Sequence, residues 1–355
     1  MAKKITVAVL FGGRSAEHEV SVRSARTVVS ALDPQKYDVK LIGIDRRGKW
    51  LLDTPASQLL AADQVSATDI NATALAASSL LEQSLGKIDV IFPVLHGPYG
   101  EDGTIQGLAK LANIPCVGAG VLGSAIGMDK DVMKRLLKEA GITVAKCRTV
   151  RFSEKSKLSF DEIKNELGMP VFIKPANMGS SVGVNKASTE QEFTAAVEAA
   201  FQYDRKIIIE EAIVGREIEC SVLGNDEPKA SLPGEVVSND DFYTYDSKYS
   251  SNSSSEIKIP AELTEQQIQE IQEIAVKAYT VLECRGMARA DFFLATNGQW
   301  YLNEINTIPG FTSISMYPKM WEASGLPLNQ LVDTLIALAI EDFQQQANLL
   351  TAPLK

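Results

Sequence analysis

Two acidic residues in the last third of the chain, Asp291 and Glu304, are predicted to face each other across a hairpin. Asn297-Gly298 between apolar runs is a strong hairpin signal, and a two-residue turn there sets Asp291 opposite Glu304 and Arg289 opposite Asn306. Opposed like charges destabilise a strand pair, whereas two carboxylates and an amide oxygen suit a hard cation such as Mg2+. The sequence therefore predicts a cation site, with a solvated hairpin face as the alternative.

The same two-residue turn fixes the pairs nearer the end of the hairpin. It sets Leu294 opposite Tyr301, and side-chain alternation puts Phe293 and Leu302 on the face of the four polar groups. The predicted cation site therefore depends on this register.

Residues 174–183 combine a lysine with a compact loop of small residues. Lys174 precedes Pro175 at the end of a predicted strand, and the loop at 179–183 contains two glycines and two serines. Small residues let backbone N–H groups approach phosphate oxygens, and a nearby lysine adds positive charge. The lysine precedes the glycines, so this is not a GxxxxGK[ST] loop. The segment predicts a phosphate-binding loop or a plain hairpin turn, and the acidic pair favours a nucleotide between two sheets.

The first third of the chain alternates predicted strands and helices. Apolar runs at 5–10, 39–44 and 88–95 are typical of buried strands. This rhythm predicts a parallel sheet with its sites at the carboxyl ends of the strands, where the loops carrying Glu17 and His96 lie. The alternative for the His96 loop is an ordinary connection between a strand and a helix.

Beyond about residue 123 the pattern changes to helices segregated from short strands. Ser159, Thr189 and Thr264 each open a predicted helix with a capping signature. Short strands are predicted at 171–174, 182–186, 207–210 and 217–223, which indicates an α+β second half. The polar, serine-rich stretch 239–255 predicts either a functional lid or a linker.

Composition excludes several classes of protein. A chain of 355 residues is long enough for two or three domains, and a net charge of -10 argues against a nucleic-acid surface. The apolar run at 5–10 is too short for a signal sequence or a membrane span, so we expect a cytoplasmic protein with no membrane partner. The four cysteines have no metal or redox spacing and are expected to be reduced and mostly buried.

The order of these motifs resembles that of the ATP-grasp superfamily. The motifs are Lys130, Lys174-Pro175, the loop 179–183, Glu210-Glu211, Arg289-Ala290-Asp291 and Glu304-Ile305-Asn306. More narrowly, the chain resembles the D-alanine:D-alanine ligase family. That likeness rests on Phe11-Gly12-Gly13-Arg14-Ser15-Ala16-Glu17, Glu19-Val20-Ser21, His96-Gly97, Gly100-Glu101-Asp102-Gly103 and the segment Asn306-Thr307-Ile308-Pro309-Gly310-Phe311-Thr312-Ser313-Ile314-Ser315. It covers essentially the whole chain.

The resemblance implies an α/β plus α+β fold. A Rossmann-like parallel-sheet domain that binds substrate, residues 1–123, would precede a two-part ATP-grasp fold. Its central subdomain with the phosphate lid would span 124–209. Its C-terminal subdomain with the metal hairpin and a mobile loop at 239–255 would span 210–355.

The resemblance also implies the reaction and its ligands. ATP would phosphorylate the carboxylate of one D-alanine, and the amine of a second would attack the acylphosphate to give D-alanyl-D-alanine for peptidoglycan. ATP, D-alanine and two Mg2+ or Mn2+ ions would bind, and the enzyme would be a cytoplasmic homodimer. The nucleotide and metal contacts would come from the following residues: Lys130, Lys174, Ser180 and Ser181 for the phosphates, Glu210 for the adenine amino group, the backbone of Glu211 and Ile213 for the ring edge, Glu217 for the ribose, and Asp291, Glu304 and Asn306 for the metals.

The remaining implied roles concern the amino acids. Glu17 would pair with the ammonium group of the first substrate, with His96 beside it. Lys248 and Ser315 would bind the carboxylate of the second substrate. Arg289 and the Gly310 backbone would stabilise the oxyanion. Ser180 and Tyr249 would form a hydrogen-bond network with Glu17 that closes the lid.

Three alternatives to this function stay open. One is a ligase of the same family that uses D-lactate or D-serine as the second substrate. Another is an ATP-grasp ligase for a different carboxylate and amine. The third is a non-catalytic nucleotide-binding module, which is disfavoured because no expected lysine or metal ligand is missing.

Overall fold

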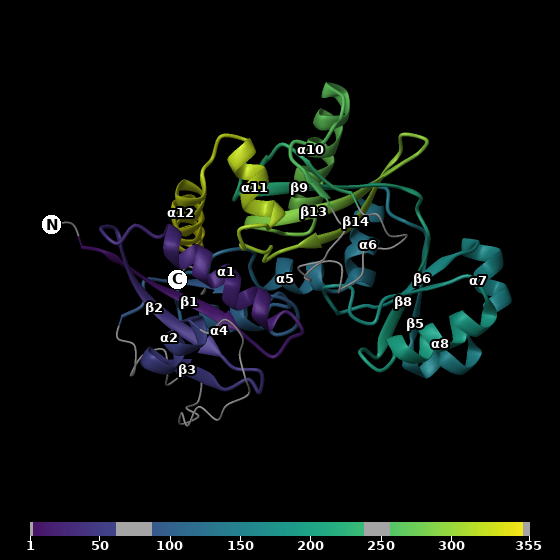
Figure 1. Ribbon diagram of the computed structural model, residues 1–355, viewed down its shortest axis with the longest axis horizontal. Coiled ribbons are helices and arrows are strands. Elements are labelled where there is room, and N and C mark those ends of the chain that lie inside the picture. The colour runs from purple at the N-terminus through teal and green to yellow at the C-terminus, as the bar shows by residue number, and fades with distance from the viewer. Residues whose placement is uncertain (1–2, 62–86, 238–255, 351–355) are drawn as a thin grey trace.

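The computed structural model describes residues 3–61, 87–237 and 256–350. Over these residues the chain forms three sheets that follow one another in sequence, each accompanied by helices (Figure 1). The structure is a mixed α/β fold in which a largely parallel sheet precedes two antiparallel sheets. The predicted change of pattern after the first third of the chain is therefore confirmed.

The first sheet has the strand order β3-β2-β1-β4. Its strands are β1 (Ile5–Gly12), β2 (Tyr37–Ile44), β3 (Trp50–Leu52) and β4 (Val90–Val94). β1 pairs in parallel with both β2 and β4, as the alternating pattern predicts, and β3 adds an antiparallel edge. The strand order reverses at β1, so the loops that follow β1 and β4 meet at a switch point, where ligands bind in such sheets.

Helices from both ends of the chain cover this sheet. The accompanying helices are α1 (His18–Ala31), α2 (Asp53–Ala61) and α4 (Thr104–Leu111). Val28 of α1, Phe92 of β4 and Leu335 of α12 (Leu328–Ala347) are fully buried in one core. Figure 1 shows α12 beside α1 at the edge of the first sheet. The last helix therefore fixes the third sheet to the first.

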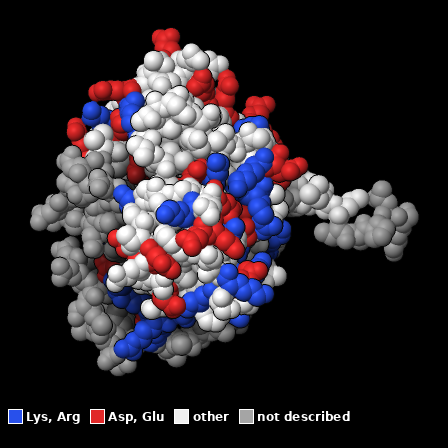
Figure 2. All heavy atoms as spheres, turned by 90° about the vertical axis from the view of Figure 1, so that its right-hand side faces the viewer, with Lys and Arg blue, Asp and Glu red and all other residues white. Residues whose placement is uncertain are grey.

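The second sheet is antiparallel and has the order β5-β8-β6-β7. It consists of β5 (Cys147–Arg151), β6 (Val171–Pro175), β7 (Asn185–Ala187) and β8 (Lys206–Glu211), with α7 (Phe160–Leu167), α8 (Glu190–Ala200) and the 3-10 helix η1 (Phe152–Lys157). Ser159 and Thr189 accept from the backbone N–H three residues on, so both predicted caps are present. Figure 2 shows acidic and basic side chains interspersed on the face formed here, and some pair, as do Lys155 and Glu198 at 2.6 Å.

The third sheet is antiparallel, with the order β12-β11-β9-β13-β14 and β10 paired to β9. Its strands are β9 (Gly215–Gly224), β10 (Lys229–Ala230), β11 (Gly234–Val237), β12 (Glu256–Lys258), β13 (Gly286–Ala295) and β14 (Trp300–Asn306). The helices are α5 (Val121–Met128), α6 (Lys130–Glu139), α10 (Glu265–Val281) and α11 (Met316–Ala323). Thr264 and Gln267 form the predicted capping box at the start of α10. Ile271, Ala275 and Phe292 join α10 to the sheet in one buried core.

The turn between β13 and β14 differs from the prediction. Ala295 N donates to Gln299 O at 3.0 Å, which leaves three residues in the turn, the last of them Gly298 with φ +82°. Leu294 therefore pairs with Trp300, and the predicted pairing of Leu294 with Tyr301 is wrong. A left-handed residue at the end of a three-residue loop is a common hairpin solution that glycine allows.

A β-bulge between Asp291 and Phe292 restores the predicted register farther along the hairpin. Asp291 lies opposite Glu304 and Arg289 opposite Asn306, as predicted. The bulge also changes which side chains share a face, because Leu302 pairs with Phe292 and is buried in the core. The prediction that Leu302 lies on the polar face is wrong, since the extra residue turns it to the opposite side.

The cysteines and the longest helices complete the description. Cys220 and Cys284 are buried, whereas Cys116 and Cys147 are half-buried, and none of the four is in a disulfide. Over the described ranges no single helix is long and apolar enough to cross a membrane. Only α11 and α12 taken together pass that test, and a bend of 106° separates them.

Candidate active site

Arg289, Asp291 and Asn306 form a connected polar group at the hairpin. Arg289 Nε and Nη2 donate to the two oxygens of Asp291 at 2.7 and 2.8 Å, and Asn306 Nδ2 donates to Asp291 Oδ2 at 2.9 Å. Glu304 lies directly opposite Asp291, and its Oε2 is 3.6 Å from Lys130 Nζ. The side chains predicted to hold a cation therefore lie together, with a cationic side chain beside each carboxylate.

A third carboxylate lies in the same row. Glu219 on β9 pairs in register with Asp291 on the side away from Glu304, and its Oε2 is 2.9 Å from Arg289 Nε. Burial disfavours the charge of Arg289, but Asp291 and Glu219 outweigh it and raise the pKa of Arg289 well above its ordinary value. Three neighbouring strands thus present Glu219, Asp291 and Glu304 side by side around one buried guanidinium.

A cavity of about 660 Å³ lies between the second and third sheets. Its lining includes Asp291, Glu304 and Asn303 of the hairpin. Every residue predicted to contact the nucleotide also lines it: Lys130, Lys174, Ser180, Ser181, Glu210, Glu211, Ile213 and Glu217. Lysines and carboxylates thus surround a space of the size that small-molecule sites occupy.

Glu210, which lines this cavity, lies close to two lysines. Lys174 Nζ donates to Glu210 Oε2 at 2.8 Å, and Lys134 Nζ lies 3.1 Å from Glu210 Oε1 without hydrogen-bond geometry. Burial by itself raises the pKa of Glu210, but the charges of Lys134 and Lys174 outweigh it and lower the pKa to about 2. The carboxylate is therefore ionised at neutral pH and can only accept hydrogen bonds.

Lys130 and Lys134 project from one face of α6, four residues apart. Asp129 caps the helix by accepting from Val132 N at 3.1 Å, and Lys206 Nζ lies 2.6 Å from Asp129 Oδ2. Lys130 Nζ donates to Met178 O at 2.7 Å, beside the phosphate loop. The helix thus holds one lysine beside the 179–183 loop and Glu304, and one beside Glu210.

The loop predicted to bind phosphate contains a tight turn with two left-handed residues, a geometry that also fits a plain hairpin turn. Ser180 and Ser181 have φ of 50° and 58°, in the left-handed region that serine seldom adopts. Val182 N donates to Gly179 O at 3.1 Å, which tightens the loop. Successive backbone N–H groups in such turns converge on a concave site for anions.

Glu17 lies against this loop. A Cβ added to Gly179 would lie 3.2 Å from Glu17 Oε2, and one added to Gly97 would lie 3.0 Å from the same oxygen. Glu17 itself is 8% exposed. The loop of the second sheet and the switch point of the first sheet therefore meet at one buried carboxylate.

His96 connects the switch point to the segment that follows β14. Its Nδ1 lies 3.0 Å from Ile308 O, and its Nε2 lies 3.3 Å from Ser24 Oγ. Ser24 Oγ accepts from Phe311 N at 3.1 Å. Burial lowers the pKa of His96, so the ring is neutral at pH 7. His96 is buried and links the loop after β4 to the segment after β14. The charge of Glu17 acts on it in the opposite direction to burial and favours the protonated ring.

Glu101 forms a second link between the same segments. Its Oε2 accepts from Gly97 N at 2.7 Å and its Oε1 accepts from Ile308 N at 3.3 Å. Burial, and then the charge of Glu17, raises the pKa of Glu101 to about 8. The alternative of an ordinary strand-to-helix loop is therefore disfavoured, because His96 and Glu101 both hold the 308–311 backbone in place.

The segment with Gly310 and Ser315 is also compact. Thr312 N donates to Ser315 Oγ at 2.9 Å, and a Cβ added to Gly310 would lie 2.8 Å from that oxygen. A larger residue at 310 would displace Ser315, which directly precedes α11. Lys248 and Tyr249, also predicted for the site, lie outside the described residues.

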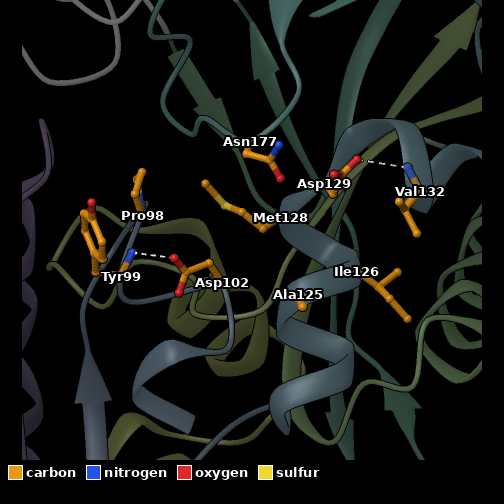
Figure 3. Close-up of a pocket in the computed structure, with 9 residues that line it drawn as sticks. All are labelled: Pro98, Tyr99, Asp102, Ala125, Ile126, Met128, Asp129, Val132 and Asn177. Carbon is orange, nitrogen blue, oxygen red and sulfur yellow. Dashed lines mark hydrogen bonds between the residues drawn. The ribbon is translucent and has the colours of Figure 1, made fainter. Parts of the chain in front are cut away.

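A second cavity of about 530 Å³ adjoins the site but contains none of the predicted site residues (Figure 3). It lies where the 98–102 loop, the junction of α5 with α6, and Asn177 meet. Tyr99 N donates to Asp102 Oδ2 at 2.9 Å on one wall, and the Asp129 cap forms another. Asp129 of this cavity directly precedes Lys130 of the larger cavity, but no residue lines both.

Sequence reasoning missed four polar residues of the site: Lys134, Glu219, Asn303 and Ser24. The spacing of Lys134 from Lys130 was visible, and so was the alternation that puts Glu219 on the face of Glu217. Asn303 could not be found, because it reaches Lys174 at 3.4 Å only through the bulge. Ser24 could not be found either, since its partners are 72 and 287 residues away.

Comparison with known proteins identifies the chain. The fold and site define a mixed α/β enzyme whose cavity lies between two antiparallel sheets. Family models described as D-ala D-ala ligase N-terminus and D-ala D-ala ligase C-terminus match residues 6–119 and 136–337. The chain belongs to the D-alanine–D-alanine ligase family.

Individual relatives match over almost their whole length. The D-alanine–D-alanine ligase of Shouchella clausii is 51% identical, with 98% of each chain covered. The structure of the D-alanine-D-alanine ligase from Coxiella burnetii is 39% identical, with a TM-score of 0.84, 98% of this chain and 97% of that chain covered. The crystal structure of VanG D-Ala:D-Ser ligase from Enterococcus faecalis is 37% identical, with a TM-score of 0.81, 95% of this chain and 100% of that chain covered.

Proposed function

We propose that this protein joins two D-alanine molecules into D-alanyl-D-alanine, with ATP as the energy source, for peptidoglycan synthesis. Family membership over nearly the whole chain supports the reaction class. The contact between Gly179 and Glu17 carries the proposal, because it brings the expected phosphate loop to the expected ammonium-binding carboxylate. Phosphoryl transfer to an amino acid requires both substrates within reach of each other.

The nucleotide would lie in the 660 Å³ cavity, as in an ATP-grasp fold. Lys130 and Lys174 would bind the phosphates together with Ser180 and Ser181. Glu210 would accept from the adenine amino group. The backbone of Glu211 and Ile213 would contact the ring edge, and Glu217 the ribose hydroxyls. The Glu211 side chain already accepts from Lys146 N at 2.7 Å, which supports a role for its backbone alone.

The residues at the hairpin fit divalent cations. Asp291 and Glu304 are adjacent across two strands, and Asn306 adds an amide oxygen, so the donors are the hard oxygens that Mg2+ prefers. Over the described residues, no three His, Cys, Asp or Glu side chains are grouped so that they could hold a metal ion, so the amide of Asn306 would be the third ligand. Asp291, Glu304 and Asn306 would hold two Mg2+ or Mn2+ ions, whose positive charge would offset the negative charge that develops on the phosphate groups.

In the first step, Glu17 orients one D-alanine by its ammonium group. A carboxylate oxygen of this D-alanine attacks the γ-phosphorus of ATP, the bond from that phosphorus to the bridging oxygen breaks, and ADP leaves. Lys130 and Lys174 hold positive charge at the transferring group throughout. The product is an acylphosphate that water must not reach.

In the second step, the amine of another D-alanine attacks the acyl carbon. Arg289 and the Gly310 N–H stabilise the tetrahedral oxyanion, and its collapse expels phosphate as the amine loses its proton. Ser315 binds the carboxylate of the second D-alanine. The family resemblance also assigns Lys248 to this carboxylate and Tyr249, with Ser180, to the lid, and Lys248 and Tyr249 lie outside the described residues. The Ser24, His96 and Glu101 links support this step by holding the 308–311 backbone.

A second candidate function differs only in the second substrate. The likeness to VanG D-Ala:D-Ser ligase, at 37% identity over 95% of this chain, favours D-serine as the alternative nucleophile. D-serine adds one hydroxyl to D-alanine, and an apolar pocket rejects an added hydroxyl only weakly. D-lactate, which offers a hydroxyl in place of the amine, is the other alternative within the family.

Three further proposals concern the domain boundaries, the cellular location and the oligomeric state. The Rossmann-like substrate domain would span 1–123, and the two ATP-grasp subdomains 124–209 and 210–355. The enzyme would act as a cytoplasmic homodimer. Limited proteolysis and light scattering of the purified chain would test these boundaries and the dimer.

Release of ADP tests the proposed function. We expect D-alanine to stimulate ADP formation in the presence of Mg2+, with L-alanine as the matched control that leaves it at the background rate. Equal ADP release with either enantiomer, or none with both, would reject the proposal.

A further inference from the structure

Lys134 is a buried lysine to which the proposed reaction gives no task. Lys134 is 1% exposed, and its Nζ lies 3.1 Å from Oε1 of Glu210, which is 3% exposed. Lysine is almost never this deeply buried unless it is paired, because desolvation of an ammonium group is costly. The Lys134 side chain is therefore the ion-pair partner of Glu210, and Glu210 lines the cavity proposed for the nucleotide.

Glu210 has two lysine partners with different surroundings. Lys174 reaches Glu210 at 2.8 Å and lines the cavity, whereas Lys134 does not belong to the lining. Under the proposed function Lys174 binds a phosphate group, so it must share or give up Glu210 when ATP enters. Lys134 stays behind the carboxylate in both situations, since it has no access to the cavity.

We infer that Lys134 is a positioning residue for the nucleotide, which holds Glu210 ionised and in place to read the adenine amino group while Lys174 turns to the phosphates. An ionised carboxylate accepts from an amino group and repels a carbonyl oxygen. ATP presents an amino group at the purine C6 position, and inosine triphosphate presents a carbonyl there. Lys134 therefore supports the choice of adenine without contacting it.

The geometry of α6 supports this division of labour. Lys130 and Lys134 are one helical turn apart, a rise of about 6 Å. Lys130 reaches Met178 O beside the phosphate loop and Glu304 at the metal hairpin, and Lys134 reaches Glu210. One rigid helix thus fixes the distance between the phosphate end and the base end of the cavity.

Lys134→Met tests the inference, which rests on the proposed function. We expect the KM for ATP to rise about tenfold or more and the preference for ATP over inosine triphosphate to fall, with the KM for D-alanine unchanged. The matched control is Lys138→Met, one turn farther along α6, where the exposed lysine contacts Cys147 Sγ at 3.5 Å. Lys134→Arg, which keeps the charge, should recover part of the ATP preference.

A double variant keeps the test decisive if Lys134→Met does not fold. Lys134→Met with Glu210→Gln removes both charges of the pair, a change that buried ion pairs often tolerate. Because Lys134 acts through Glu210, the double variant should bind ATP no more weakly than Glu210→Gln alone. Fully additive losses, or a Lys134→Met enzyme with the ATP KM and nucleotide preference of Lys138→Met, would overturn the inference. Failure of the proposed function differs from both, since the unmodified enzyme would then show no ADP release dependent on D-alanine.

Discussion

Arg289 donates two hydrogen bonds to Asp291, from Nε to Oδ1 at 2.7 Å and from Nη2 to Oδ2 at 2.8 Å. The residue proposed to stabilise the oxyanion therefore holds a residue proposed to bind metal. Coordination of a cation by Asp291 would require Arg289 to release these hydrogen bonds and turn toward the reacting carbonyl. Glu219, with Oε2 2.9 Å from Arg289 Nε, can retain the guanidinium during that exchange.

The exchange predicts an effect of Glu219→Gln on metal dependence. Without this carboxylate, Arg289 should depend more on Asp291, so the Mg2+ concentration for half-maximal rate should rise about tenfold, equivalent to about 1.4 kcal/mol. Asp226→Asn is the control, since Asp226 pairs with Arg285 at 2.6 Å away from the site. An unchanged Mg2+ dependence in Glu219→Gln would show that Glu219 takes no part in the exchange.

Glu304→Gln tests the metal hairpin itself. We expect turnover to fall at least about a hundredfold at ordinary Mg2+ concentrations, because a carboxylate ligand is lost. The free energy of unfolding without metal should stay level or rise, since repulsion from Asp291 is relieved while one ion pair to Lys130 at 3.6 Å is lost. Near-normal turnover of the variant would contradict the assignment of Glu304 as a metal ligand.

Lys174→Ala tests the phosphate end of the cavity. We expect kcat to fall about a hundredfold or more, because the charge acts on the transferring phosphoryl group, and calorimetry should still detect D-alanine binding. Lys164→Ala is the matched control, an exposed lysine of α7 outside the cavity lining, and it should stay near the unmodified rate. Loss of D-alanine binding with surviving ATP turnover would move Lys174 to the amino-acid site.

The acidity of Glu210 predicts how stability depends on pH. Burial raises its pKa, but Lys134 and Lys174 outweigh burial and lower the pKa from 4.5 to about 2. The ionised group therefore stabilises the fold fully above about pH 4.5, and this stabilisation is lost as the pH falls toward 2. In urea unfolding at pH 6, the unmodified protein should have a larger free energy of unfolding than Glu210→Gln. This difference should be smaller at pH 3. A gap that does not change with pH would contradict the ion pairs at Glu210.

The hairpin shows how far the sequence alone reaches. The alternation of side chains and the Asn297-Gly298 signal place Asp291 opposite Glu304 correctly, although the turn has three residues instead of two. The prediction succeeds because a bulge cancels the extra turn residue, and nothing in a single sequence reveals a bulge at Asp291 and Phe292. Local propensity fixes the faces of strands, whereas bulges depend on what packs against them.

The rest of the site depended on contacts between distant segments. Family resemblance named the nucleotide residues, and the structure brings all of them to one cavity. Neither pattern nor resemblance assigned Lys134, because a lysine four residues after another is normally read as part of a solvated helix face. Its burial against Glu210, 76 residues later, arises only when α6 comes to lie beside the end of β8.

The mass of the product formed from mixed substrates tests the central claim most directly. The enzyme would receive ATP, Mg2+ and equal concentrations of D-alanine, D-serine and D-lactate at neutral pH. We predict D-alanyl-D-alanine as the main product, formed in a one-to-one ratio with ADP. Mainly D-alanyl-D-serine or D-alanyl-D-lactate, or ADP without any ligated product, would contradict the claim that this chain makes D-alanyl-D-alanine.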